Sequence, residues 1–375
     1  MSVQVKEVLT KKQFNDWIEF PNRFYKDNPN FVPFLTPDEK ATFNPKTNPA
    51  YEFCQTKLFL AYKQNKVVGR IAGLVNHAYN KKWQKNAIRF TRFDFIDDKE
   101  VSSALFNAVV DWGKQQGFTE IMGPIGFTDM DHEGMLVEGF DQFNMSITFY
   151  NHPYYLEHMQ QLGLKKDIDW VEYLIPVPKQ LDQRIERISS HVLKKNELEY
   201  VSYKNRKQLR ADVKKAFELV DVCFSVLYGT VPLTPKIIDK VADDYVPIIN
   251  LDYVCSIKDK QGKIIGFAAL CPSIAKALKK SNGRLFPFGI FRMLKALKSK
   301  KNDTLEMYFV AVLPEYQSKG LPAIMMYQLT KMCVENGIKY CETGPELEHN
   351  EAVRSFWKNF DARLHRRRRA WKKDI

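Results

Sequence analysis

The stretch LEMYFVAVLPEYQSKGLPA, residues 305–323, decides the fold of this chain. It begins with the β-rich run 307–312, and Pro314 marks where that strand must stop, because proline cannot donate a ladder hydrogen bond. The turn 317–320, QSKG, follows, and a helix opens near Leu321. Glycine can adopt a positive φ, and the first N–H groups of a helix have no partner within it. The segment therefore predicts a strand, turn and helix that bind a pyrophosphate.

The next segments extend this pattern. Apolar residues recur with a helical period across 323–336, and Gly337 is placed to end that helix as a C-cap. A short strand is expected at 338–341. The spacing P-x-x-Q-x-x-G from Pro314 to Gly320 resembles the acetyl-CoA-binding motif of the GCN5-related N-acetyltransferase (GNAT) superfamily.

Two departures from the family pattern concern the same cofactor. Pro322 replaces a small residue after the turn, which removes one N–H donor from the first helical turn. Asn350 resembles the family Asn that opens a helix beside the CoA arm, but Trp357 occupies the place of a Tyr that commonly acts as general acid. An indole cannot protonate a thiolate, so another acid, or water, is expected. The resemblance implies acyl-CoA as co-substrate, bound by Val310, Val312, Gln317, Ser318, Lys319, Gly320, Leu321, Ala323 and Asn350.

An internal repeat predicts the architecture. The hairpin sequence KVVG at 66–69 is echoed by KIIG at 263–266, and similar matches continue downstream. We therefore expect a fold of the α/β class, with an α+β mixed sheet, made of two tandem GNAT-like repeats at 1–180 and 190–375. The charged segment 179–204 between them contains no glycine and is interpreted as a connecting helix.

The two repeats are not equivalent. At the position of the CoA loop, the first repeat reads FIDDKEVSS, residues 95–103, with no glycine and three carboxylates. These charges would repel a pyrophosphate. The second repeat is therefore expected to bind the nucleotide, and the first to supply structure and part of the acceptor site.

Composition sets the broad class. Hydrophobic residues make up 45% of the chain and charged residues 27%, which excludes a disordered protein. The N-terminus has no apolar signal region, and no stretch approaches the roughly 18 apolar residues of a membrane span, so a cytoplasmic protein is expected. The six cysteines form no C-x-x-C pair and have no histidine at metal spacing. We expect reduced, mostly buried thiols and no metal.

The net charge of +13 is concentrated in an insertion at residues 274–301, which contains no acidic residue. Its apolar residues predict two amphipathic helices around Asn282 and Pro287. We interpret it as a surface that lies on the inner face of an anionic membrane, whereas a helical pair packed on the core remains an alternative and a nucleic acid partner is not expected. The basic residues are Lys276, Lys279, Lys280, Arg284, Arg292, Lys295, Lys298, Lys300 and Lys301.

A second basic run, RLHRRRRAWKK at 363–373, occupies the place of the last GNAT strand. Strand alternation would place Arg366 and Arg368 on one face and Arg367 and Arg369 on the other. Two interpretations remain open: contacts with CoA phosphates or lipid headgroups, or a charged edge strand that discourages aggregation.

N-acyl transfer needs a base that removes a proton from an ammonium group. Glu306 is the first candidate, because it opens the strand that holds the CoA arm, and EMYFVAV resembles the strand that carries the base glutamate of histone-acetylating GNATs. Burial beside an apolar cleft would raise its pKa towards the working range. Tyr308 lies two residues further on and is a candidate hydroxyl donor, although a strand aromatic is often core.

A second candidate cluster lies in the long segment 124–155 of the first repeat. His132 and Glu133 are adjacent there and could act as a base with its orienting partner, or bind the acceptor, or be structural. The pattern EGMLVEGFD at 133–141 resembles the bacterial ceramide synthase-like GNATs, tandem-repeat enzymes that N-acylate a sphingoid base.

The sequence thus predicts an acyl-CoA-dependent N-acyltransferase whose acceptor is an amine, with a long-chain sphingoid base implied by the resemblance. Two alternatives remain. A Fem-type aminoacyl transferase has a tandem GNAT fold but uses tRNA and needs no CoA loop. A non-catalytic protein that binds acyl-CoA or lipid would be compatible with Trp357 in place of the tyrosine.

Overall fold

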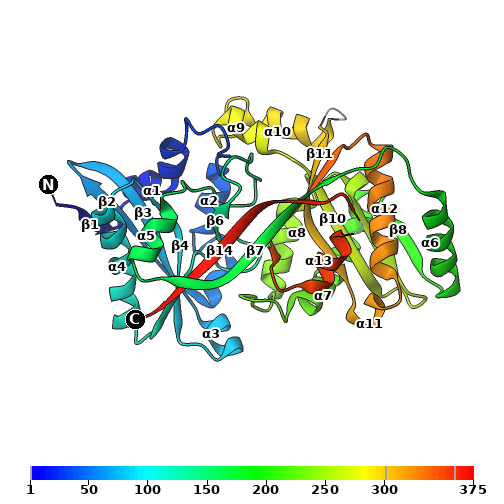
Figure 1. The fold of residues 1–375 in the computed structure, drawn as a ribbon, viewed down its shortest axis with the longest axis horizontal. Helices are drawn as coiled ribbons and strands as arrows, with labels where there is room; N and C mark the ends of the chain where they lie inside the picture. The colour runs from blue at the N-terminus through cyan, green and yellow to red at the C-terminus, as the bar shows by residue number, and fades with distance from the viewer. Residues whose placement is uncertain (1, 300–301, 359) are drawn as a thin grey trace.

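The computed structural model describes residues 2–299, 302–358 and 360–375. Its two halves lie side by side and share one mixed sheet, which confirms the predicted fold class and tandem arrangement (Figure 1). The first half contains β1 (Gln4–Glu7), α1 (Lys11–Phe24), α2 (Thr36–Thr42), β2 (Cys54–Lys63), β3 (Lys66–Asn76), α3 (His77–Trp83), β4 (Ala87–Phe95), α4 (Lys99–Gln115), β5 (Glu120–Gly123), β6 (Met135–Glu138), α5 (Tyr155–Gln161) and β7 (Lys165–Pro176).

The second half repeats this order of elements. The segment 179–204, predicted as a connecting helix, is helical only up to Lys195, where α6 ends. It then continues as the edge strand β8. The elements are α6 (Gln183–Lys195), β8 (Glu199–Ser202), α7 (Arg206–Phe224), α8 (Pro235–Tyr245), β9 (Val254–Lys258), β10 (Ile264–Pro272), α9 (Ala275–Ser281), α10 (Gly289–Lys298), β11 (Thr304–Val312), α11 (Pro314–Gln317), α12 (Leu321–Glu335), β12 (Tyr340–Thr343), β13 (Glu346–Leu347), α13 (Glu351–Trp357) and β14 (Arg363–Asp374).

Each half contains one parallel strand pair that separates part-way along its length. β11 pairs with β12 only from Thr304 to Met307, although β11 continues to Val312. In the first half, β4 pairs with β5 only from Ala87 to Arg89. Beyond these points β11 and β4 continue without ladder pairing to that neighbour, and the end of the pairing of β11 with β12 is called the splay below.

The two halves exchange their last strands. The order of strands along the sheet is β1-β2-β3-β4-β5-β14-β7-β12-β11-β10-β9-β8. β14, which ends the second half, therefore pairs with β5 of the first half, and β7 of the first half pairs with β12 of the second. β7 and β14 also pair with each other and cross the middle of the molecule (Figure 1).

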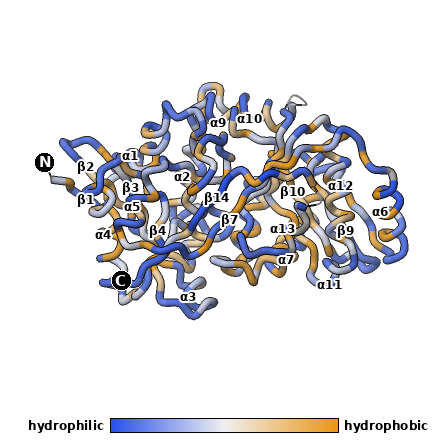
Figure 2. The backbone as a smooth tube through the Cα atoms, viewed as in Figure 1, coloured by the Kyte–Doolittle hydropathy of each residue, from blue (hydrophilic) through white to orange (hydrophobic). Residues whose placement is uncertain are grey.

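The arginines of β14 alternate as predicted, but the edge-strand interpretation is wrong because β14 is central. Figure 2 shows this hydrophilic strand running through the middle of the molecule. Arg366 and Arg368 are fully buried and both donate to the Glu172 carboxylate. Arg369 pairs on the other face with Asp169, at 2.7 Å. These guanidinium groups are engaged in buried ion pairs, so they do not provide a free surface for phosphates or headgroups.

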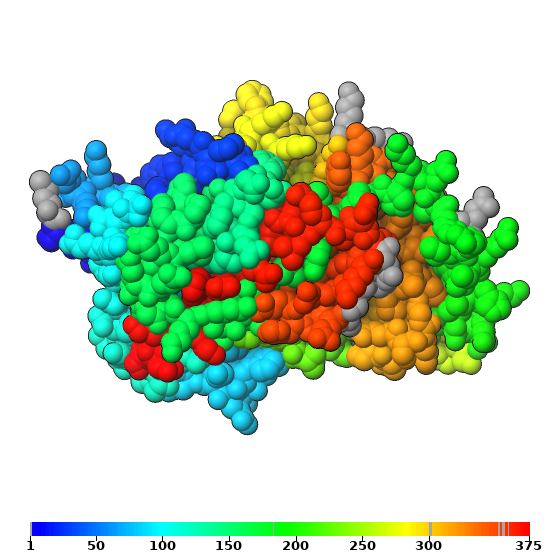
Figure 3. Space-filling model, viewed as in Figure 1, coloured from blue at the N-terminus to red at the C-terminus, as the bar shows by residue number. Residues whose placement is uncertain are grey.

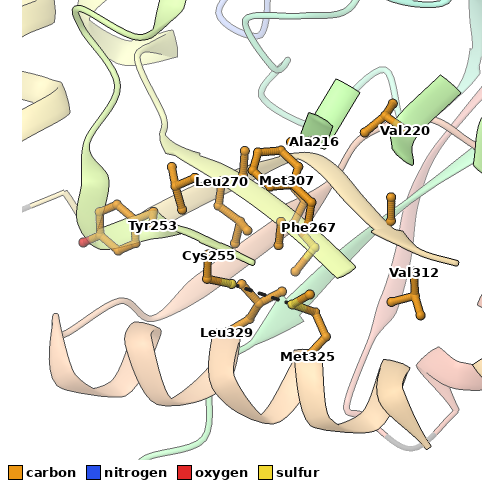
Figure 4. Close-up of a cluster of buried hydrophobic side chains, with 14 of the residues drawn as sticks. Ala216, Val220, Tyr253, Cys255, Phe267, Leu270, Met307, Val312, Met325 and Leu329 are labelled. Carbon is orange, nitrogen blue, oxygen red and sulfur yellow. Dashed lines mark hydrogen bonds between the residues drawn. The ribbon is translucent and has the colours of Figure 1, made fainter. Parts of the chain in front are cut away.

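The main hydrophobic core lies between the second-half sheet and its helices. Figure 4 shows Cys255 and Leu270 of the sheet, Ala216 and Val220 of α7, and Met325 of α12 within it. α12 ends at Glu335, and Gly337 has φ 71°, as predicted for the residue after the helix. No helix among the described residues is long and apolar enough to cross a membrane.

Residues 274–299 form α9 and α10, which lie over the junction of the two halves. One side of this hairpin packs on the first half, where Leu278 and Met293 contact Val32. The Lys279 ammonium also donates to the Phe31 carbonyl oxygen, at 2.9 Å. The predicted basic residues Lys300 and Lys301 lie outside the described residues.

Candidate active site

The predicted pyrophosphate turn is an exposed loop that leads into α12. Gly320 is the N-cap of this helix, with φ 79° and ψ 5°. No described atom lies within 4 Å of the point where a Cβ of Gly320 would be. The Gln317 amide donates to the Val312 carbonyl oxygen at 2.9 Å, which fixes the turn against the end of β11. The loop thus presents free backbone N–H groups and open space at a helix N-terminus, which suits a bound phosphate.

The other predicted cofactor residues differ in exposure and in position. Ser318, Lys319 and Ala323 are exposed around the loop, and Val310 lies on β11 beyond the point where β12 diverges. Leu321, by contrast, is buried in the core. The Asn350 carboxamide oxygen accepts a hydrogen bond from the Val353 N–H at 3.4 Å, so its side chain caps α13.

The first half fills the equivalent opening with its own side chains. Asp98 caps α4 by accepting from the N–H groups of Glu100 and Val101. The Phe95 N–H donates to the Tyr155 hydroxyl at 2.8 Å, and the Tyr154 hydroxyl donates to the Phe95 carbonyl oxygen at 2.5 Å. A carboxylate therefore occupies the helix N-terminus, and two tyrosines occupy the main-chain groups at the end of β4.

Glu306 lies at the splay of β11 and β12, on the face of the sheet that meets the first half. Its side chain is 0% exposed. One carboxylate oxygen accepts from the Ser273 hydroxyl at 2.7 Å, and the other accepts from the Ser146 hydroxyl at 2.8 Å. Ser146 belongs to the long connection between β6 and α5, so the first half contributes directly to the surroundings of this carboxylate.

A second carboxyl group lies beside Glu306. Glu342 of β12 is its register partner in the parallel pair. Burial raises the pKa of Glu306, against the effect of the two serine hydroxyls. Burial also raises the pKa of Glu342 to about 7, although Arg366, whose Nη2 lies 3.5 Å from Glu342 Oε2, favours its charged form. Glu342 can therefore gain or lose a proton near neutral pH beside Glu306.

Tyr308 lies at an irregularity in the pairing of β10 with β11, where the register shifts between Ala269 and Leu270. Burial raises the pKa of Tyr308 well above its ordinary value, and the charges of Cys271 and Glu306 raise it further. The hydroxyl therefore stays protonated and can act only as a hydrogen-bond donor or acceptor beside Glu306.

His132 lies on the first-half side of the same junction. Its ring is held between Phe34 and Phe149, with centroid distances of 5.0 and 5.1 Å. Its Nδ1 atom lies 3.4 Å from Asp131 Oδ1. Its Nε2 atom is buried and has no hydrogen-bond partner among the described residues.

The proposed pairing of His132 with Glu133 does not match this geometry. The carboxylate beside the imidazole is Asp131, which Arg92 also holds at 2.7 Å. Burial raises the pKa of Glu133 well above its ordinary value, with Asp129 as the next cause, so Glu133 belongs to a different carboxyl pair.

Several residues that complete the junction were missed from the sequence. Tyr245 of α8 is 48% exposed and lies near Asp38 of α2, which is also exposed. Partial burial and then the charge of Asp38 raise the pKa of Tyr245, and partial burial and then the charge of Asp244 raise the pKa of Asp38. The only signal for Glu342 was its position directly after the strand expected at 338–341. Ser146, Ser273, Asp38 and Tyr245 gave no comparable signal.

The chain is similar to known proteins in both sequence and fold. Residues 217–361 match the family model described as Acetyltransferase (GNAT) family. This match lies within the second half of the chain and supports acyltransferase activity in general. The tandem GNAT protein from the clavulanic acid biosynthesis pathway has the same fold, with a TM-score of 0.57 and 9% identity over 100% of this chain and 98% of that chain.

Two curated proteins are similar along their whole length. Protein YghO of Escherichia coli (strain K12) is 26% identical over 99% of this chain and 95% of that protein. The bacterial ceramide synthase of Caulobacter vibrioides (strain NA1000 / CB15N) is 24% identical over 100% of this chain and 98% of that protein.

Proposed function

We propose that this protein transfers an acyl group from acyl-CoA to the amine of a long-chain lipid, of the sphingoid-base type. The observation that carries the proposal is the buried Glu306 at the splay of β11 and β12, enclosed by Ser273 from its own half and Ser146 from the other. A base at this point lies between the proposed acyl-CoA site of the second half and the part of the first half that carries Ser146.

The second half is the proposed site of acyl-CoA. The loop at Gly320 has open space and unpaired helical N–H groups for the pyrophosphate, and the diverging strands leave main-chain groups of β11 for the pantetheine arm. Bound acyl-CoA supplies the activated thioester. The first half is not proposed to bind a nucleotide, because Asp98, Tyr154 and Tyr155 fill its equivalent opening.

Glu306 is the proposed general base. Its carboxylate is enclosed, so the proton of the ammonium group would reach it through the hydroxyl of Ser146 or Ser273. Each serine can donate to Glu306 and accept from the amine at the same time. Glu342 lies on the same face and could take the proton onward, because its pKa is about 7.

The acceptor is proposed to lie between the halves. Asp38, Tyr245 and the unpaired Nε2 atom of His132 are polar groups at this junction. They could bind the ammonium and hydroxyl groups of an amino alcohol. The similarity to a bacterial ceramide synthase over the full length of both chains supports a sphingoid base as the particular amine.

A lipid acceptor is also supported by the outer face of α9 and α10. Phe286, Phe288 and Phe291 are 78%, 62% and 68% exposed. Figure 3 shows this yellow hairpin at the upper edge of the molecule, beside the blue N-terminal helices. Ser273, which contacts Glu306, lies just before α9, so a lipid drawn from a membrane at this hairpin would enter next to the base. The exposed basic residues around the phenylalanines suit anionic headgroups, and these are Lys276, Lys280, Arg284, Arg292, Lys295 and Lys298.

Replacing Phe286, Phe288 and Phe291 together by serine is expected to weaken binding to anionic vesicles, because each ring contributes roughly 1.5 to 3 kcal/mol when fully buried. Vesicle co-sedimentation measures the loss. Raising the salt should weaken wild-type binding, since the Debye length falls from about 10 Å at 0.1 M to about 3 Å at 1 M. Turnover of a short, water-soluble amine should be retained, while turnover of a long-chain amine in vesicles should fall.

Val226→Ser is the matched control, because Val226 is an equally exposed apolar residue, at 79%, away from this hairpin. It should bind vesicles as the wild type does. A wild-type protein that does not bind anionic vesicles at low salt would contradict the membrane proposal and leave the hairpin as a support between the halves.

The direct test of the proposed function is an assay of thiol release with the purified protein. A panel of acyl-CoAs of increasing chain length would be combined with amines that range from polyamines to sphingoid bases, and the products identified by mass spectrometry. We expect thiol release to depend on the amine and to be greatest with a long-chain amino alcohol. Binding of acyl-CoA without thiol release for any amine would favour a non-catalytic binding protein.

A further inference from the structure

Glu346 forms a carboxyl site that the roles described so far do not use. It lies in β13, three residues after Thr343, where the parallel pairing of β11 and β12 ends. Its Oε2 atom accepts a hydrogen bond from the indole Nε1 of Trp357 at 2.8 Å. The indole fixes one carboxyl oxygen, and Trp357 is itself only 6% exposed.

Glu346 and Glu306 lie on opposite faces of the sheet. Glu342, which shares the face of Glu306, is opposite Leu174 of β7, whereas Glu346 is opposite Val171. Side chains alternate along a strand, so positions 174 and 171 of β7 face opposite ways. The two carboxyl groups therefore flank the splay of β11 and β12 from its two sides.

The face of Glu346 is also the face on which α12 begins. A Cβ on Gly266 would meet the Met325 side chain of α12 at 2.8 Å. Gly266 shares its face of β10 with Leu270, which is the register partner of Met307. Met307 directly follows Glu306 in β11 and so points to the opposite face. The carboxyl group of Glu346 thus lies on the side of the sheet where the pyrophosphate loop leads into α12.

The protonation of Glu346 suits a proton donor. Burial raises the pKa of Glu346 to about 8, while the hydrogen bond from Trp357 favours the charged form. The carboxyl group is therefore mainly protonated at neutral pH. On the same segment, Glu348 is paired with Lys166 at 2.6 Å and with Arg367 at 3.4 Å, and His349 lies 3.6 Å from Glu348. The carboxylate of Glu348 is thus paired with basic side chains, whereas the hydrogen-bond partner of Glu346 among the described residues is the neutral indole of Trp357.

We propose that Glu346 is the general acid that protonates the thiolate leaving group, an inference that rests on the proposed acyl transfer. The amine nitrogen forms a bond to the thioester carbonyl carbon, and the carbon–sulfur bond breaks with its electron pair left on sulfur. The Glu346 carboxyl group gives its proton to that sulfur. Two protons leave the nitrogen on the other face: the ammonium proton passes to Glu306 before the attack and is released to solvent, and the proton that the attached nitrogen then loses follows the same path. Glu346 regains a proton from solvent.

The Glu346→Gln variant tests this role by its pH profile. In the wild type, kcat for thiol release should fall as the pH rises through about 8, because the acid is then deprotonated. In the variant, kcat at pH 7 should be lower than in the wild type by at least about a hundredfold, and the alkaline fall should be absent. Affinity for acyl-CoA, measured by calorimetry, should be unchanged.

The Trp357→Phe variant is the companion test, because it keeps an aromatic ring and removes the indole N–H, although the ring that remains is smaller. Loss of a hydrogen bond that favours the charged carboxylate should raise the pKa of Glu346 and move the alkaline fall of kcat to higher pH. A merely structural pair would lower Tm in both variants without moving that fall. If the wild type turns over acyl-CoA and both variants keep its pH profile, this inference is overturned while the proposed function stands; no turnover by the wild type overturns the function itself.

Discussion

Replacing Gly320 by aspartate is expected to abolish acyl-CoA binding while the protein stays folded. Gly320 has φ 79°, a conformation that Asp and Asn adopt more readily than other residues. No described atom lies within 4 Å of the new Cβ position, so the fold itself tolerates the side chain. The added carboxylate would enter the space proposed for the pyrophosphate. At an effective dielectric constant of 20, two charges about 4 Å apart repel by about 4 kcal/mol, which corresponds to roughly a thousandfold loss of affinity.

The Gly320→Asn variant is the matched control. Asparagine has nearly the same size and the same tolerance for positive φ, but it carries no charge. We expect it to bind acyl-CoA more weakly than the wild type and clearly more tightly than the aspartate variant. Calorimetry measures both affinities, and circular dichroism verifies the fold. Unchanged affinity in a folded Gly320→Asp protein would move the cofactor site away from this loop.

Replacing Glu306 by glutamine is expected to lower turnover by about two to four powers of ten, the usual contribution of a general base. Glutamine retains the shape of the side chain, and its amide oxygen can still accept from one of the two serines that contact Glu306, Ser146 and Ser273, while its amide N–H can donate to the hydroxyl oxygen of the other. Affinity for acyl-CoA should therefore be unchanged. Steady-state kinetics with a thiol reagent separate the two effects.

The pH dependence of the wild type gives a second measurement of the same role. A general base acts when it is deprotonated, so activity should rise as the pH increases through the pKa of Glu306. Burial raises that pKa, so the rise should occur above the ordinary range of a carboxyl group. Glu342→Gln is the matched control on the neighbouring strand. A loss of turnover in that variant but not in Glu306→Gln would assign the base to Glu342. Unchanged turnover in both variants would make His132 the next candidate base.

The local part of this structure could be predicted from the sequence. The strand before Pro314, the turn at Gly320 and the helix after it depend on residues that are adjacent in the chain, and the structure contains all three. The alternation of Arg366 and Arg368 with their neighbours also follows from strand geometry alone.

The remaining part depends on contacts between distant residues. No pattern in 363–373 indicates that β14 would pair with β5 of the other half, and so the burial of Arg366 and Arg368 against Glu172 could not be foreseen. The serine that contacts Glu306 lies 160 residues away in the chain. Serine is common in loops, so its role becomes visible only when the fold brings it to the carboxylate.

The exchange of β7 and β14 limits how a substrate can enter the site. In many two-lobed proteins a cleft opens when the lobes rotate about a flexible link. Here the two halves are joined by a ladder of main-chain hydrogen bonds between β7 and β14, with pairs from Arg363 with Leu174 to Lys372 with Lys165 and two shifts of register between them. Rotation of one lobe away from the other would break that ladder. Substrate entry must therefore use smaller movements of the parts that cover the site, namely the α9–α10 hairpin and the connection that carries Ser146.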